Sequence, residues 1–303
     1  ISVGAITVGF GLSPVNPYTV GTGHRIAELP LFSGSLYRSI ICMTGLSLLA
    51  WYNIKYFKSI TANITNGLSD GLDTHGFTLS KPLDEYKMSA KDKMVMMSFL
   101  VAVLVILYGA YELHWFINQI SAIFCMLAIV IGLINKNNGQ QFGEIILKSV
   151  AVVAPGAFMV GMATSIKVAL DMGNISDTIA YTLSSALMGL PVFVSAMGMA
   201  VAQTCMNFII PSGSGQALAT LPVMIPVGEV IGMTRQSTVL AFQIGDGVSN
   251  LINPSLGGLV AMLAMCRVPF DRWLRFIFPF FIMILVLALV FLACSIPLKY
   301  GPF

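Results

Sequence analysis

The sequence has 303 residues, of which 56% are hydrophobic and only 10% are charged, and its formal net charge at pH 7 is +3. With a mean hydropathy of +0.85, this composition excludes an ordinary soluble domain and indicates an all-α integral membrane protein with several spans. The five cysteines stand singly in apolar segments and the three histidines are scattered. We therefore expect no metal site, no haem and no other cofactor.

The apolar segments reach or approach the ~20 residues that cross a bilayer as a helix. The sequence starts at Ile1 in a glycine-rich apolar stretch that lacks the basic start and cleavage site of a signal peptide, and we expect the chain to be truncated at its front. In chain order, the expected segments are 1–30 (broken near Asn16-Pro17), 36–56, 94–111, 117–134, 149–170, an interrupted pair at 190–232, 235–266 (broken near Asn253-Pro254) and 276–296.

The one long polar stretch, 57–93, is rich in Asn, Ser, Asp and Lys and is predicted to be a cytoplasmic loop. With this loop in the cytoplasm, eleven of the sixteen Lys and Arg residues lie on the cytoplasmic side. That bias agrees with the positive-inside rule. The remaining five are then expected on the opposite side: Arg25, Arg38, Lys167, Arg235 and Lys299.

A weak internal similarity relates the two ends of the chain. A shift of 237 positions lays Asn16-Pro17 on Asn253-Pro254 and Arg38 on Arg275. Under the orientation above the two copies run oppositely through the membrane, which predicts the inverted repeat of a secondary transporter. The first-half partner of the hairpin described next is expected to be missing. The predicted division is 1–56 as the end of the first repeat, 57–93 as the loop, and 94–303 as the second repeat with three spans, a re-entrant hairpin (190–232), a broken helix (235–266) and a last span (276–296).

The stretch IPSGSGQ, 210–216, interrupts an apolar segment with a proline, which cannot donate a backbone hydrogen bond, and with two glycines. The following piece, 217–232, is about 24 Å long as a helix and too short for the ~30 Å hydrocarbon core. We expect a re-entrant hairpin whose tip lines a cavity, where backbone N–H groups and the helix dipole favour a carboxylate. A simple proline kink is the alternative. The predicted tip consists of Ser212, Gly213, Ser214, Gly215 and Gln216.

The stretch FQIGDGVSNLINPSLGG, 242–258, contains the second interruption, where a helix is expected to restart at Ser255. Freed carbonyls, together with Ser249, Asn250 and Asn253, are hard oxygen ligands suited to a sodium ion or to a substrate ammonium.

Asp246 is the acidic residue placed most deeply in the predicted spans of the second half. Charged groups at such depth are costly and usually functional, so Asp246 is predicted to bind a cation or a proton. The alternative is a structural ion pair with Arg235 or Lys167. No arginine is expected inside the membrane near the hairpin, which weakens the case for a doubly anionic ligand.

Two stretches carry a resemblance to a known family. "IPSGSGQALATLPVMIPVGEVIGMTRQSTVLAFQIGDGVSNLINPSLG", followed by "RVPFDRWLRFIFP", resembles the YfcC-type branch of the anaerobic four-carbon-dicarboxylate carriers (DcuC-like) in the ion transporter superfamily, and "NPYTVGTGHRIAELPLFSGSLYRS" resembles their first-half segment. The resemblance implies a homodimer of two-repeat subunits in the bacterial inner membrane. It implies that substrate and coupling ion bind at the hairpin tip and at Asn16, Pro17, Asn250, Asn253 and Pro254. We also expect Thr19 and Ser255 to contribute to the substrate site, and the coupling ion to bind at Asp246, Ser249, Asn250 and Asn253.

The patterns favour secondary transport of small charged organic solutes, coupled to Na⁺ or H⁺ or run as an exchange. The resemblance implies basic amino acids or four-carbon dicarboxylates as these solutes. An ion or anion channel with interrupted helices is an open alternative. An intramembrane hydrolase using Ser214 is disfavoured, because no histidine lies in the second half to act as base. We expect lipid and a small charged solute as partners, no nucleic acid, and no enzymatic activity.

Overall fold

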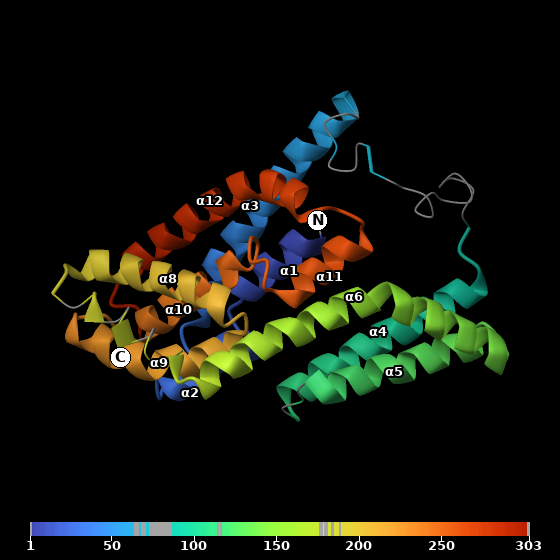
Figure 1. Ribbon diagram of the computed structural model, residues 1–303, viewed down its shortest axis with the longest axis horizontal. Coiled ribbons are helices and arrows are strands. Elements are labelled where there is room, and N and C mark those ends of the chain that lie inside the picture. Colours follow the sequence, from blue (N-terminus) through green and yellow to red (C-terminus); the bar gives the residue numbers. More distant parts are fainter. Residues whose placement is uncertain are drawn as a thin grey trace. The chain divides into compact units, whose positions relative to one another are not determined.

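The computed structural model describes residues 2–63, 67, 71–72, 87–113, 115, 117–175, 178, 181–182, 185–187 and 189–301, and the regular elements within these ranges are all helical. Figure 1 shows the helices in chain order. Two compact units form: Ile1–Asp73 with Val153–Phe303, and Thr74–Val152. The all-α class expected from the composition is confirmed.

The smaller unit contains α4 (Ala90–Tyr111) and α5 (Ile117–Ile134), which pack against each other. Ser89 begins α4 with a reciprocal cap, since its hydroxyl accepts from the backbone N–H of Asp92 and its own N–H donates to the Asp92 carboxylate. The helix α6 (Gly139–Met172) follows and continues into the larger unit.

The larger unit begins with α1 (Ser2–Gly11), a π-helical turn η1 (Pro17–Gly21) and α2 (Thr22–Ile26), followed by α3 (Ser35–Ala62). Helix α1 stops five residues before η1, because Asn16 adopts an extended conformation and its side-chain oxygen accepts from the N–H of Tyr18 at 2.9 Å. Pro17, which lacks an N–H, suits the first position of the turn. The expected break near Asn16-Pro17 is therefore present.

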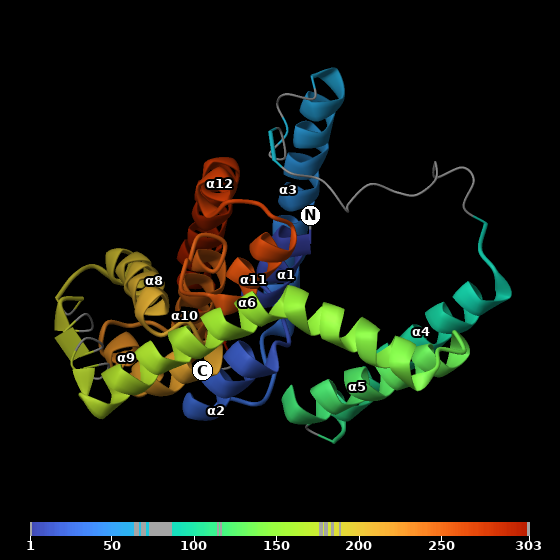
Figure 2. The same ribbon diagram turned by 45° about the vertical axis from the view of Figure 1, so that its right-hand side comes forward.

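The rest of this unit holds the two predicted interruptions. The hairpin arms are α8 (Val192–Ile209) and α9 (Gly213–Val230), and the broken helix consists of α10 (Arg235–Ser249) and α11 (Gly257–Met265). Helix α12 (Phe270–Ser295) ends the unit. Figure 2 shows these helices from a second direction.

Several expected boundaries were wrong. Helix α3 continues to Ala62, α6 begins at Gly139 and α12 begins at Phe270, so each extends beyond its expected segment. The tip residues belong to the first turn of α9, because the Ser212 hydroxyl accepts from the N–H of Gly215 at 3.3 Å and so caps a helix that starts at Gly213. The second arm is thus 18 residues long, about 27 Å at 1.5 Å per residue. The helix after the second break starts at Gly257 rather than Ser255, since the Asn253 side chain holds the N–H of Ser255 in a turn at 2.9 Å.

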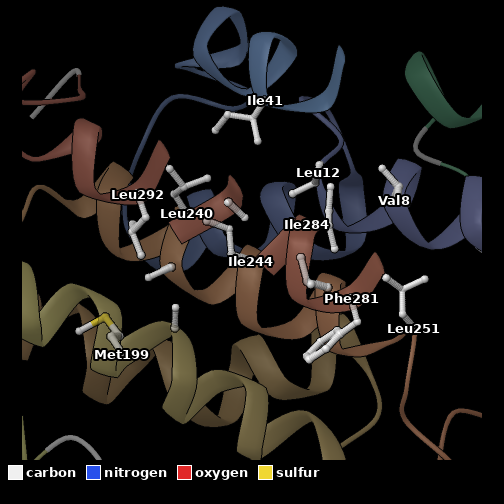
Figure 3. Close-up of a cluster of buried hydrophobic side chains, with 14 of the residues drawn as sticks. Val8, Leu12, Ile41, Met199, Leu240, Ile244, Leu251, Phe281, Ile284 and Leu292 are labelled. Atoms are coloured by element: carbon white, nitrogen blue, oxygen red, sulfur yellow. The ribbon is translucent and has the colours of Figure 1, made fainter. Parts of the chain in front are cut away.

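Helix α10 lies at the centre of the larger unit. Each of its residues from 236 to 249 is buried, and it contacts α1, α8, α9 and α12. Figure 3 shows Leu240 and Ile244 of α10 in a cluster with apolar side chains of the surrounding helices. Because water reaches no side of this segment, its polar side chains must find partners inside the protein.

Several helices are suited to a bilayer. By length and composition, three helices of the described residues could cross a membrane, Ala90–Gly109, Val192–Ile209 and Phe270–Ser295, and Asn118–Ile134 is a shorter apolar helix. The inverted repeat, the truncated front and the division of the chain at 57–93 stay predictions.

Candidate functional site

Two glycines hold Asp246 between neighbouring helices. A Cβ on Gly245 would lie 2.6 Å from the backbone oxygen of Ala200 in α8, and a Cβ on Gly247 would lie 2.0 Å from the Cα of Gly11 in α1. Real Cβ atoms do not approach so closely, so α8 and α1 both touch the backbone of α10 here only because these positions lack side chains. The Gly-Asp-Gly sequence therefore puts the aspartate at the tightest crossing of the unit.

The carboxylate of Asp246 meets the hairpin tip and the first helix break. A Cβ on Gly213, the first residue of α9, would lie 3.4 Å from Asp246 Oδ2 and 2.7 Å from Thr19 Cγ2. Asp246 is 1% exposed and Thr19 is fully buried. Within the part of the chain that the structure describes, the two carboxylate oxygens of Asp246 and the hydroxyl of Thr19 have no hydrogen-bond partner.

The electrostatic setting of Asp246 follows from these neighbours. The start of α9 carries unpaired backbone N–H groups, and a negative charge beside a helix N-terminus is stabilised. The alternative partner Arg235 is engaged elsewhere, with Glu28 at 3.1 Å and with Glu229 at 2.5 Å. The side chain of Lys167 lies outside the described residues. The arrangement can thus accept a cation or a proton at Asp246.

Asn207 on α8 joins the hairpin to the broken helix, a role that the sequence patterns did not predict. Its side-chain N–H group donates to the backbone oxygen of Asp246 at 2.9 Å, to Ser249 Oγ at 2.7 Å and to Asn250 Oδ1 at 2.7 Å. Its backbone oxygen accepts from Asn253 Nδ2 at 2.7 Å. A buried amide four residues before the hairpin proline was the available signal.

Several of the expected ion ligands make hydrogen bonds inside the protein. The hydroxyl of Ser249 and the side-chain oxygens of Asn250 and Asn253 have partners there, and an amide oxygen with two lone pairs can still accept a cation. Among the described residues, the buried side-chain oxygens without a hydrogen-bond partner belong to Asp246, Thr19, Asn207 and Gln216.

Other predicted site residues differ in their burial. Gln216 turns back into the hairpin, where its Nε2 donates to the backbone oxygen and to Oε1 of Gln203, while its own buried Oε1 has no partner among the described residues. Pro17 and Pro254 are exposed, and Ser214 is half-buried.

The expected absence of an arginine within the membrane near the hairpin stays a prediction, but Arg38 is buried in the larger unit. It is 1% exposed and its Nε donates to Gln243 Oε1 of α10 at 2.9 Å. Long side chains at a helix start can fold inward when neighbouring elements supply acceptors, and the local sequence does not reveal this.

The sequence matches known carriers over nearly its whole length. The model of the DcuC family, C4-dicarboxylate anaerobic carriers, covers residues 1–297. Over 284 residues the chain is 32% identical to the putative basic amino acid antiporter YfcC of Escherichia coli, an alignment that covers 89% of this chain and 56% of that protein. It is 25% identical over 306 residues to an uncharacterised protein of Haemophilus influenzae, covering 98% and 60%. The chain thus spans somewhat more than half the length of these relatives.

Among solved structures, the chain is similar to the Alcanivorax borkumensis YdaH transporter, with 15% identity and a TM-score of 0.41 over 99% of this chain and 80% of that one. The family, together with the apolar helices of the chain, confirms the expected location in the bacterial inner membrane. Because the family consists of carriers, an enzymatic role for Ser214 is set aside. The chain belongs to the DcuC family of C4-dicarboxylate anaerobic carriers.

Proposed function

We propose that the chain forms part of a secondary active transporter for small charged organic solutes. The observation that carries this proposal is the buried, unpaired carboxylate of Asp246 beside Gly213 and Thr19. These three residues come from the broken helix, the hairpin tip and the first helix break. A site made from interrupted helices of both chain halves is typical of alternating access, and it favours a carrier over a channel.

Asp246 acts in this proposal as the group that binds the coupling cation. A carboxylate away from water is stable only when a proton, a metal cation or an ammonium group neutralises it. A sodium ion would also find hard oxygens at Thr19 and Asn207. Binding of the cation would hold the hairpin tip against η1, and its release would let the two separate.

The substrate is a basic amino acid or a four-carbon dicarboxylate. The family name supports the dicarboxylate, and the name of the Escherichia coli relative supports the amino acid. The start of α9 offers N–H groups to a carboxylate in either case. An amino acid would bring its own cation to Asp246, whereas a dicarboxylate would need Na⁺ or H⁺ there. We further propose that the subunits pair as homodimers within the lipid bilayer.

Ligand-dependent thermal stability tests the proposal. Purified full-length protein in detergent is heated with arginine, ornithine, fumarate or succinate, each with and without sodium. A ligand at a hundred times its dissociation constant adds about 2.7 kcal/mol to the apparent stability. Stabilisation by arginine or ornithine without sodium identifies an amino-acid exchanger, and stabilisation by a dicarboxylate only with sodium identifies a coupled anion carrier. Equal unfolding temperatures in all mixtures would contradict both.

A further inference from the structure

Arg38 is fully enclosed and is held by neutral groups. Its Nε donates to Gln243 Oε1 at 2.9 Å. Its Nη1 donates to Gln236 Oε1 and to the Tyr300 hydroxyl, both at 2.9 Å, and to the backbone oxygen of Ser33 at 3.1 Å. These acceptors come from α10, from the chain's C-terminal residues and from the loop before α3. They fix the guanidinium in place without contributing any negative charge.

The charge of Arg38 has no counter-charge among the described residues. Glu28 is the acidic residue closest to Arg38 along the sequence. Its side chain is 80% exposed and pairs with Arg235. The second terminal nitrogen, Nη2, is buried and has no hydrogen-bond partner in the described ranges of the chain. A guanidinium carries five N–H donors and cannot lose its charge inside a protein. Burial of an uncompensated cation is unfavourable, so an anion is the missing partner.

His24 does not supply that negative charge. Its Nε2 lies 3.2 Å from Gln236 Oε1, the atom that also accepts from Arg38. Because arginine can only donate, this atom of Gln236 must be the amide oxygen, and His24 Nε2 must carry a hydrogen. The imidazole is therefore neutral or positive, and its buried Nδ1 also has no partner in the described part of the chain. Arg38 therefore contributes a positive charge that no neighbouring group among the described residues balances.

We propose that Arg38 Nη2 binds a small, singly charged anion, either chloride or the carboxylate of an organic acid. This site is separate from the cation site at Asp246 and lies between α3 and the first half of α10. The predicted repeat equivalent, Arg275, is 84% exposed and lies 3.8 Å from Asp271, so it needs no such ligand. Arg275 therefore provides a matched control at the same position of the other copy.

The test is the anion dependence of thermal unfolding at constant sodium concentration. Purified full-length protein in a neutral detergent is heated in sodium gluconate, whose bulky anion serves as the reference, and in sodium chloride, acetate or succinate. Tryptophan fluorescence reports unfolding. At a hundredfold excess over its dissociation constant, the bound anion should raise the unfolding temperature by about 5–10 °C above gluconate. Chloride as the effective anion identifies an inorganic ion, and acetate or succinate identifies an organic carboxylate.

The variants Arg38→Gln and Arg275→Gln complete the test. Arg275→Gln should keep the anion-dependent rise and Arg38→Gln should lose it. A wild-type unfolding temperature that is the same in all four salts would overturn the proposal, as would a rise that survives in Arg38→Gln. If Arg38→Gln does not fold, crystals of the wild type soaked in bromide decide the matter: an anomalous peak at Arg38 Nη2 supports the site and its absence refutes it. Because sodium is constant and solute is absent, the result does not depend on transport through Asp246.

Discussion

At the scale of single residues, Asp246 and Arg38 are both buried charged groups, one negative and one positive. Each is 1% exposed, and each lacks an oppositely charged partner among the residues that the structure describes. Removing a charge from water is unfavourable unless something nearby compensates for it. Asp246 lies beside a helix start and a helix break, where a moving hairpin could admit a cation. Arg38 is fixed by four hydrogen bonds, which suits a permanently bound anion.

The substitution Asp246→Asn keeps the shape of the side chain and removes its charge. Interactions of this kind contribute about 1.5–3 kcal/mol, so cation affinity should fall about ten- to a hundredfold and coupled transport should be lost. The unfolding temperature without ligand should be unchanged or higher, since a buried charge is gone. Uptake by proteoliposomes under an imposed sodium or pH gradient measures this.

Asp271→Asn is the matched control, because Asp271 is 65% exposed and pairs with Arg275 on the same helix face. It should transport like the wild type. A wild-type ion dependence in Asp246→Asn would show that the coupling ion binds elsewhere.

At the scale of helices, the site depends on how closely α1, α8 and α9 approach α10. The crossing of α1 and α10 is a backbone contact at Gly11 and Gly247, and α8 touches Gly245. Asn207 then links α8 to the residues after α10. Gly213, the first residue of α9, lies beside the Asp246 carboxylate.

The substitution Gly247→Ala tests this crossing. Its Cβ would overlap the backbone of Gly11, which no rotamer change can relieve, so α1 must shift. Overpacking of this kind destabilises by about 1–3 kcal/mol, and the unfolding temperature should fall. Gly258→Ala is the control, since nothing lies within 4 Å of its Cβ in α11, and alanine should stabilise that helix by up to about 1 kcal/mol. Equal effects of the two variants would contradict the close crossing.

At the scale of the whole molecule, the chain is a membrane protein of a carrier family with its polar groups gathered inside the larger unit. Many large apolar side chains of α4, α5 and α12 are exposed, as expected of helices that face lipid. The orientation in the membrane is predicted from the distribution of Lys and Arg. It determines which introduced cysteines a reagent outside the cell can label.

Single cysteines introduced into a cysteine-free background should report the orientation. Lys87→Cys lies before α4 on the predicted cytoplasmic side, and Leu298→Cys lies after α12 on the other side; both positions are exposed. In spheroplasts of a bacterial host, a membrane-impermeant maleimide should label Leu298→Cys at once and Lys87→Cys only after permeabilisation. The reverse pattern would invert the assigned orientation, and immediate labelling of both would reject the predicted number of crossings between them.

Much of the local structure could be predicted from the sequence, because its causes are local. Local features fix the breaks at 12–16, 210–212 and 250–256, independently of the surrounding helices. These features are a proline without an N–H, an asparagine that holds the N–H two residues later, and glycines beside a serine cap. The exact helix starts were missed, since a cap moves a start by a few residues without changing the break.

By itself, the sequence determined the membrane class and the helix breaks, each of which depends on composition or on residues a few positions apart. Only the tertiary structure decided that Thr19, Gly213 and Asp246 meet, that Asn207 donates hydrogen bonds to Ser249 and Asn250, and that Arg38 is buried. Which polar groups lose their water depends on helices packing around α10 from distant parts of the chain, and no local pattern encodes that packing.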